Sequence, residues 1–175
     1  TDALALKGIS MIAENLEKAY ENGEDREARR NMMIASTIGG MAFISSNVGA
    51  VHAFAETVGA WFDTPHGVAN SLFLPYIMEF NIPACPERFA DIADAMGIER
   101  EESMSDEQYA LKAVEYVKAL NRKLNIPTIK EIKGITEERF EAIAERSANN
   151  VLSNDNARKI TKEDYLELLK KAYNE

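Results

Sequence analysis

His52 and His66 are the residues of this sequence best suited to bind a metal ion. They are the only histidines among 175 residues, and 14 positions separate them. Neutral imidazole is the commonest protein ligand for transition metals. Both histidines lie in the least charged stretch of the chain, residues 47–70. Two such side chains that reach one ion would supply half of a metal site.

The spacing decides whether the two rings can meet. On one continuous helix, 14 residues span nearly four turns, or roughly 21 Å, so shared ligation would be impossible. The segment Asp63-Thr64-Pro65 has the composition of a turn, and a reversal there would bring His66 back towards His52. His66 would then begin a helix beside Gly67.

A structural role for both histidines stays open at this point. In that alternative each ring is satisfied by backbone partners. The sequence has no His-Glu-x-x-His motif, and catalytic zinc sites usually have three protein ligands. Residue types and spacing therefore predict at most half of a metal site.

Composition excludes several classes of protein. Hydrophobic residues make up 46% and charged residues 28%, as in ordinary soluble domains, and the length predicts a single domain. The net charge of −9 argues against a nucleic-acid partner, because phosphate binding requires clustered Lys and Arg. No apolar run approaches the roughly 20 residues of a membrane span. The single Cys85 and the absence of a signal peptide favour a cytoplasmic protein.

Hydrophobic periodicity predicts helices throughout, and no segment alternates long enough to predict a strand. The fold class is therefore all-α, a single multi-helix domain of about eight helices over residues 1–175. The first four expected helices cover residues 4–20, run from a cap at Asp25 to Phe43, carry His52 and end near Gly59, and cover residues 67–80. The fifth is opened by Pro83 and Pro86 and closed by Gly97, and the sixth starts at a Ser105–Gln108 capping box and runs to about Leu124. Thr136 and Thr161 cap the last two.

Two adjacent glycines, Gly39 and Gly40, lie inside the second expected helix. Each costs about 1 kcal/mol in a helix interior. Close approach of another backbone usually offsets such a cost, so we expect a neighbour there.

The surrounding residues resemble a known family. The pattern comprises Gly49-Ala-Val-His52-Ala-x-Ala, Gly59-Ala, Pro65-His66-Gly67-x-Ala-Asn70, Leu74-Pro75 and Glu79-Phe80-Asn81. It is similar to the signature of the iron-containing (group III) alcohol dehydrogenases. The likeness extends to both ends of the chain, including Thr1-Asp-Ala-Leu-Ala-Leu-Lys7 and Asn156-Ala-Arg158.

The resemblance implies a metal-binding helical domain of the dehydroquinate synthase-like fold. Members of the family have a preceding α/β domain that binds NAD or NADP, and the present sequence has no Gly-rich loop for it. Since the sequence begins at Thr1 within helical periodicity, we expect a piece of a longer chain, although a processed complete protein stays open. In the family, two further ligands, an Asp and a His, lie just upstream.

The implied chemistry is the interconversion of small alcohols with aldehydes or ketones. His52 and His66 would bind Fe²⁺ or Zn²⁺, which acts as a Lewis acid, and hydride passes to the nicotinamide. Phe43 matches a substrate-pocket aromatic, and Trp61 and Phe62 are weaker candidates for that pocket. The resemblance implies a homo-oligomer at full length and an inactive chain in isolation, and the charge and hydropathy above predict no nucleic-acid or membrane partner.

One position departs from the family pattern. Four residues after His52 the dehydrogenases commonly have a second histidine, often assigned to proton relay, and this chain has Glu56. Glu56 is the candidate for proton transfer here, with a different charge.

Two other functions stay open on the sequence. The chain is alternatively a stand-alone helical interaction module without catalysis, or part of a glycerol dehydrogenase-type oxidoreductase. The sequence does not identify the alcohol, and it does not choose between iron and zinc.

Overall fold

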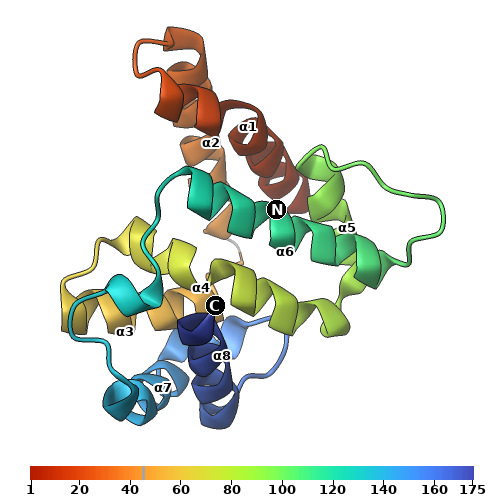
Figure 1. The fold of residues 1–175 in the computed structure, drawn as a ribbon. Coiled ribbons are helices and arrows are strands. Elements are labelled where there is room, and N and C mark those ends of the chain that lie inside the picture. Colours follow the sequence, from red (N-terminus) through yellow and green to blue (C-terminus); the bar gives the residue numbers. More distant parts are fainter. Residues whose placement is uncertain (45) are drawn as a thin grey trace. The chain divides into compact units, whose positions relative to one another are not determined.

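The computed structural model describes residues 1–44 and 46–175 and is all-α (Figure 1). Across these residues it has eight α-helices, four short 3₁₀ helices and no strand, which confirms the predicted fold class. The α-helices are α1 (Asp2–Glu21), α2 (Arg26–Phe43), α3 (Ala50–Phe62), α4 (His66–Asn81), α5 (Pro86–Ala95), α6 (Asp106–Lys123), α7 (Phe140–Ala148) and α8 (Lys162–Asn174). The 3₁₀ helices are η1 (Ile82–Ala84), η2 (Ile129–Glu131), η3 (Glu137–Arg139) and η4 (Val151–Asp155).

The chain folds as two compact units. The first comprises Thr1–Asn47 and Cys85–Tyr116, and the second comprises Val48–Ala84 and Val117–Glu175. Within the described ranges, every helix is too short or too polar to span a membrane.

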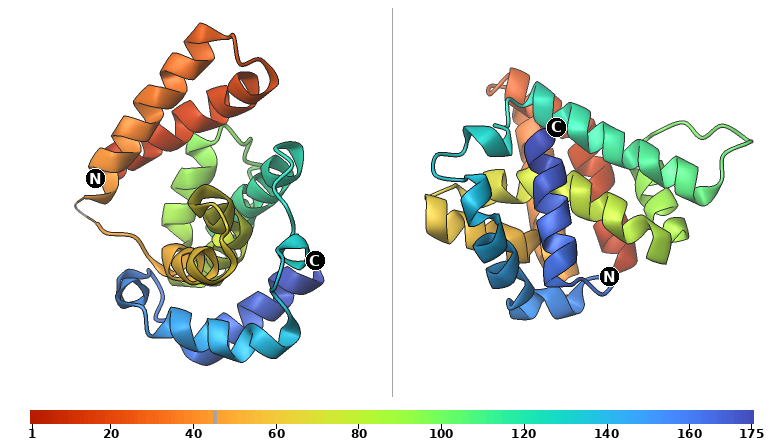
Figure 2. Two further views of the ribbon diagram at one scale, coloured as in Figure 1. Left: turned by 90° about the vertical axis from the view of Figure 1, so that its left-hand side faces the viewer. Right: turned by 60° about the horizontal axis from the view of Figure 1, so that its bottom comes forward.

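The first unit is built on the hairpin of α1 and α2, which lie side by side (Figure 2). Asp25 starts α2 as predicted, because its Oδ1 accepts hydrogen bonds from the backbone of Glu27 and Ala28 at 3.1 and 2.9 Å. The small residue at the contact is Gly8 of α1, where an added Cβ would lie 3.8 Å from the carbonyl oxygen of Ala35.

The neighbour expected at Gly39 and Gly40 is present beside Gly39, because a Cβ on Gly8 of α1 would lie 4.0 Å from the Gly39 nitrogen. An added Cβ at either position would meet no described atom within 4 Å. The side of α2 on which their own Cβ atoms would stand is open, and the close approach is made by Gly8 of α1 against Ala35 and Gly39.

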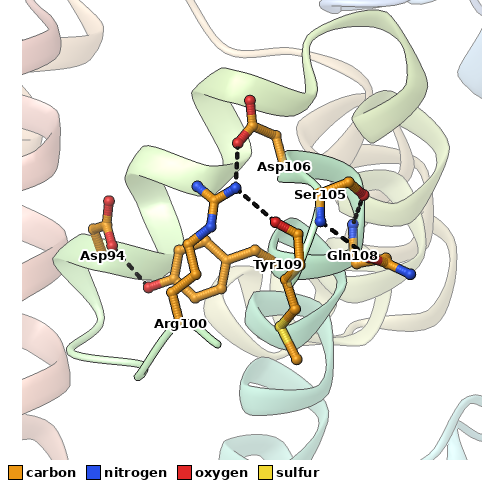
Figure 3. Close-up of polar contacts among 7 residues, drawn as sticks. Asp94, Arg100, Ser105, Asp106, Gln108 and Tyr109 are labelled. Carbon is orange, nitrogen blue, oxygen red and sulfur yellow. Dashed lines mark hydrogen bonds and ion pairs between the residues drawn. The ribbon is translucent and has the colours of Figure 1, made fainter. Parts of the chain in front are cut away.

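Arg100 and Tyr109 order the loop between α5 and α6 (Figure 3). Arg100 Nη2 donates to Asp106 Oδ1 at 2.7 Å and to the carbonyl oxygen of Met104 at 2.9 Å, and its guanidinium lies over the Tyr109 ring. The buried Tyr109 presents its hydroxyl to Asp94 Oδ1 at 2.8 Å and to the carbonyl oxygen of Ile98 at 2.5 Å. Burial, with the Asp94 hydrogen bond, raises the pKa of Tyr109 to about 12.

The predicted capping box then starts α6. Gln108 Oε1 accepts from the Ser105 N–H at 3.0 Å, and the Ser105 hydroxyl accepts from the Gln108 N–H at 3.2 Å. The helix ends at Lys123, one residue before the predicted limit.

The second unit packs α3 and α4 against α7 and α8. Phe54 of α3 stacks on Phe73 of α4 with ring centroids 4.1 Å apart and meets Tyr165 of α8 edge-on at 4.6 Å. All three side chains are fully buried. The aromatic cluster therefore joins three helices at the centre of this unit.

The two predicted threonine caps near the end of the chain have different outcomes. Thr161 caps α8 through a reciprocal capping box with Asp164, as predicted. Thr136 makes no side-chain cap, so that expectation is wrong. A 3₁₀ turn, η3, precedes α7, and α7 begins only at Phe140.

We expect Tyr109→Phe to destabilise the fold by about 1–2 kcal/mol, because two acceptors lose the hydroxyl they face. Urea unfolding followed by circular dichroism measures the change. The matched control is Tyr173→Phe, since the contacts of Tyr173 are made by its ring with Phe140 and Lys130. A Tyr109 effect no larger than that of the control would contradict the role given to this hydroxyl.

Candidate metal centre

The structure brings His52 and His66 together. Their ring centroids lie 5.3 Å apart, and the ring planes are tilted by 53°. His52 is in the first turn of α3, and His66 is the first residue of α4. The convergence that the sequence made possible is therefore observed.

The turn between the helices produces this convergence. Helix α3 continues to Phe62, three residues beyond the predicted end, and Asp63 then takes a left-handed conformation with φ of 49°. The turn packs closely on α3, because a Cβ at Gly59 would lie 3.3 Å from the carbonyl oxygen of Thr64. His66 is thereby returned towards the beginning of α3.

His52 is held in the form that binds metals. It is partly buried, and burial lowers its pKa below the usual value of 6.5. The neighbouring His66 lowers the pKa further, whereas Glu56 acts in the opposite direction. The imidazole is therefore neutral near pH 7, with one nitrogen lone pair available.

Asn70 fixes the orientation of His66. Its Nδ2 donates to the His66 carbonyl oxygen at 2.9 Å and lies 3.0 Å from His66 Nε2. Reversing the amide would place Oδ1 against a carbonyl oxygen, so Nδ2 is the group that faces Nε2. Asn70 Oδ1 is buried without a hydrogen-bond partner among the described residues. It leaves an unused acceptor beside the pair.

The geometry fits two ligands of one ion. Two imidazoles bound to a tetrahedral metal at nitrogen distances of about 2.0–2.1 Å have ring centroids roughly 5 Å apart. The two rings already have that separation. Within residues 1–44 and 46–175, however, no group of three His, Cys, Asp or Glu side chains is arranged to hold a metal. These residues fit part of a coordination set.

Glu56 is held by a different partner. Its Oε2 accepts a hydrogen bond of 2.7 Å from Nδ2 of Asn150. Asn150 also accepts from the Leu152 N–H, and it begins η4. The exposed carboxylate of Glu56 therefore influences His52 through its charge, since it raises the pKa of that residue.

The three aromatic candidates have different surroundings. Phe43 belongs to the first unit and is 53% exposed. Trp61, at the end of α3, is 43% exposed and packs edge-on against Phe62 at 6.5 Å. Phe62 itself packs on Gly134, where an added Cβ would lie 3.1 Å from its ring, and under the Arg139 guanidinium.

Sequence reasoning gave no role to three asparagines near the pair, although Asn70 and Asn156 belong to the family-like pattern. Asn70 had a usable signal, because four residues separate it from His66 and the two share a helix face. Asn150 and Asn156 contact α3 from positions about 100 residues later in the chain, and no local pattern announces either contact.

Comparison with known proteins identifies the family. The model of the Fe-containing alcohol dehydrogenase family, C-terminal, matches residues 1–173. The chain belongs to the iron-containing alcohol dehydrogenase family. It is 39% identical to alcohol dehydrogenase 4 of Saccharomyces cerevisiae over 176 residues and 38% identical to 1,3-propanediol dehydrogenase of Citrobacter freundii over 173 residues. Each alignment covers 99% of this chain and 44% of the relative.

A solved family structure has the same fold. Alcohol dehydrogenase from Oenococcus oeni superposes with a TM-score of 0.93 at 38% identity, and the match covers 98% of this chain and 45% of that one. The chain thus corresponds to the C-terminal helical part of iron-containing alcohol dehydrogenases and spans less than half of the length of these relatives.

We expect two substitutions to move the pKa of His52 in opposite directions in the metal-free chain. His66→Ala removes a neighbouring imidazole and raises the pKa, whereas Glu56→Gln removes a negative charge and lowers it. NMR titration of the His52 ring measures both pKa changes. A change in the opposite direction in either variant would contradict the causes assigned to the pKa of His52.

The same pKa shift has a consequence for stability. Because the folded chain holds the pKa of His52 below 6.5, the unfolded state binds more protons as the pH falls through that value. His52 therefore weakens the fold below about pH 6.5 and has no such effect above it. Comparing unfolding of the chain and of His52→Gln at pH 7.5 and 5 tests the sign.

Proposed function

We propose that this chain is the metal-holding part of an NAD(P)-dependent alcohol dehydrogenase that interconverts small alcohols with aldehydes or ketones. The observation that carries the proposal is the convergence of two imidazoles, 5.3 Å apart, at the first turns of α3 and α4. The membership of the family supports the reaction class.

His52 and His66 would hold Fe²⁺ or Zn²⁺ through one ring nitrogen each. The bound ion supplies Lewis acidity that lowers the pKa of an alcohol hydroxyl. The described residues offer two nitrogen ligands, so we assign the other ligands to a part of the enzyme outside this sequence. The packing of α3 on α4 keeps the two imidazoles in place as the substrate arrives.

Glu56 is the proposed proton acceptor. It lies one turn after His52 on α3, and Asn150 holds one of its carboxylate oxygens. Its other oxygen is available to take the proton that an alcohol releases. A carboxylate here gives the relay a negative charge that a histidine would lack.

The substrate and nicotinamide would lie between this chain and the nucleotide-binding part of the enzyme. Phe43, Trp61 and Phe62 are the proposed aromatic lining, and Phe62 offers the least free surface because Gly134 and Arg139 pack on it. NAD or NADP would be bound outside this chain, which has no Gly-rich phosphate loop. We further propose a cytoplasmic, homo-oligomeric enzyme without nucleic-acid or membrane partners.

A helical interaction module is the second candidate. The observation in its favour is the outer face of α2, where Met33 is 71%, Met41 55% and Ile44, just past the helix end, 76% exposed. Exposed apolar side chains gathered on one helix mark contact surfaces. Such a module would bind no metal at His52 and His66, so metal titration separates the two candidates.

We expect the chain to bind Zn²⁺ in a one-to-one complex, with an affinity at least tenfold lower in His52→Ala and in His66→Ala, because one imidazole alone holds the ion poorly. Isothermal titration calorimetry on chelator-treated protein measures the affinity, and Tyr173→Phe is the control that keeps it. Equal affinity in all variants would remove the ligand assignment. Oxidation of small alcohols with NAD⁺ by the chain alone would contradict the placement of the cofactor elsewhere.

In the enzyme completed with its nucleotide-binding part, Glu56→Gln is expected to lower kcat about a hundredfold near pH 7, because the relay group no longer takes a proton. Glu56→His should restore most of the rate. Metal content, measured by elemental analysis, should not change in either variant. An unaltered rate in Glu56→Gln would exclude the relay.

A further inference from the structure

The Asn156 side chain joins the beginning of α3 to the end of α4. Its Oδ1 accepts hydrogen bonds from the Ala50 N–H at 3.3 Å and from Asn81 Nδ2 at 3.1 Å. Its Nδ2 donates to Asn81 Oδ1 and to the carbonyl oxygen of Arg158, both at 2.7 Å. Asn81 is buried and is the last residue of α4. One amide thus bonds both helices that carry the histidines.

Helix α3 depends on this distant amide for its cap. The residue before the helix is Gly49, which has no side chain to accept from the first-turn N–H groups. The acceptor for the Ala50 N–H is Oδ1 of Asn156, which lies 106 residues later in the chain. A Cβ on Gly49 would lie 3.1 Å from Asn156 Oδ1 and 3.3 Å from its Cα, so glycine permits the approach.

The next residues hold α4 in the same way. Arg158 Nη1 donates to the carbonyl oxygen of Phe80 at 3.0 Å, and its guanidinium lies over the Phe80 ring at 4.1 Å. The side chains of Asn156 and Arg158 therefore hold the last turn of α4, and Asn156 also caps α3.

These contacts close the helix pair at both ends. The short Asp63–Pro65 turn joins the end of α3 to the start of α4, and Asn156 joins the start of α3 to the end of α4. Two rigid helices fixed at both ends have little freedom to rotate or slide. His52 is the third residue of α3, so a shift of the α3 start moves its ring directly.

We propose that Asn156 is a positioning residue for the metal pair, which sets the separation of the His52 and His66 rings by fixing α3 against α4. The inference rests on the proposed function, since it concerns the affinity of those two rings for a metal. Asn156 itself contacts neither ring in any described interaction, and it acts through Ala50 and Asn81.

The test measures Zn²⁺ binding to the whole chain by calorimetry. Asn156→Ala is expected to bind Zn²⁺ about tenfold more weakly, at the low end of the range for residues that orient metal ligands. With Cu²⁺ as a second probe, electron paramagnetic resonance should show two coordinated imidazoles in the parent chain and one in the variant. A loss of stability alone would leave the number of coordinated imidazoles unchanged.

Asn121→Ala is the matched control. It also removes an asparagine that bonds α4, through Asn121 Nδ2 and the carbonyl oxygen of Ser71 at 2.7 Å, but at the middle of the helix. Its Zn²⁺ affinity should stay within twofold of the parent chain. Equal weakening in both variants would overturn the proposal, because general loosening of the unit would then explain it.

The remaining outcomes separate this inference from the proposed function. If His52→Ala abolishes Zn²⁺ binding while Asn156→Ala leaves it intact, the positioning role is wrong and the ligand assignment stands. If His52→Ala binds Zn²⁺ as well as the parent chain, the ligand assignment fails and the positioning role fails with it. Should Asn156→Ala not fold, Gly49→Ala must weaken binding in the same way, and unchanged binding in that variant overturns the proposal.

Discussion

The stacking of Phe54 on Phe73 is the contact on which the arrangement of the second unit depends. The two rings are nearly parallel and fully buried, and Tyr165 closes the cluster from α8. Phe54 follows His52 by two residues, so the face of α3 that carries the stack differs from the face that carries the histidine. Because the aromatic face of α3 is buried against α4, His52 lies at the edge of the contact between the two helices. The turn after α3 places His66 next to it there.

Polar groups inside this unit are satisfied by a chain of hydroxyls. Ser147 Oγ donates to Thr57 Oγ1 at 3.2 Å, and Ser153 Oγ donates to the Ser147 carbonyl oxygen and lies 2.7 Å from the Tyr165 hydroxyl. The chain connects α3, α7, η4 and α8 through buried side chains. Since buried hydroxyls without partners are costly, these bonds restrict how the helices can pack. They complement the aromatic cluster, whose rings meet in stacked and edge-on contacts.

Much of this architecture could be predicted from the sequence, because its determinants are local. Asp25, Ser105 and Thr161 start helices through bonds to residues two or three positions away, and such patterns are visible in one dimension. The turn at Asp63–Pro65 is local in the same sense. The cap predicted at Thr136 was wrong because threonine is a common capping residue, whereas the chain after Thr136 first makes a 3₁₀ turn.

The rest could not be predicted because its causes are distant in the chain. The partner of Glu56 lies 94 residues later, and the acceptor for the first turn of α3 lies 106 residues later. The sequence shows a glycine at position 49, but the reason for it is the close approach of Asn156, which only the fold reveals. The histidine pair could be identified from the sequence as a candidate centre, and so could the nearby Asn70, but the distant side chains that support the pair could not.

The exposure of His66 has a consequence for how a site of this kind would acquire its ion. His66 is at the surface and His52 is partly buried, so an ion at the pair would be open to exchange with its surroundings in this chain. Binding would then come to equilibrium instead of being trapped during folding. Under the proposed function, the supply of each metal in the cell, together with the intrinsic preference of imidazole nitrogen, would decide which ion is held. If another part of the protein covered His66, the ion would exchange slowly, and the metal present when the site closed would stay bound.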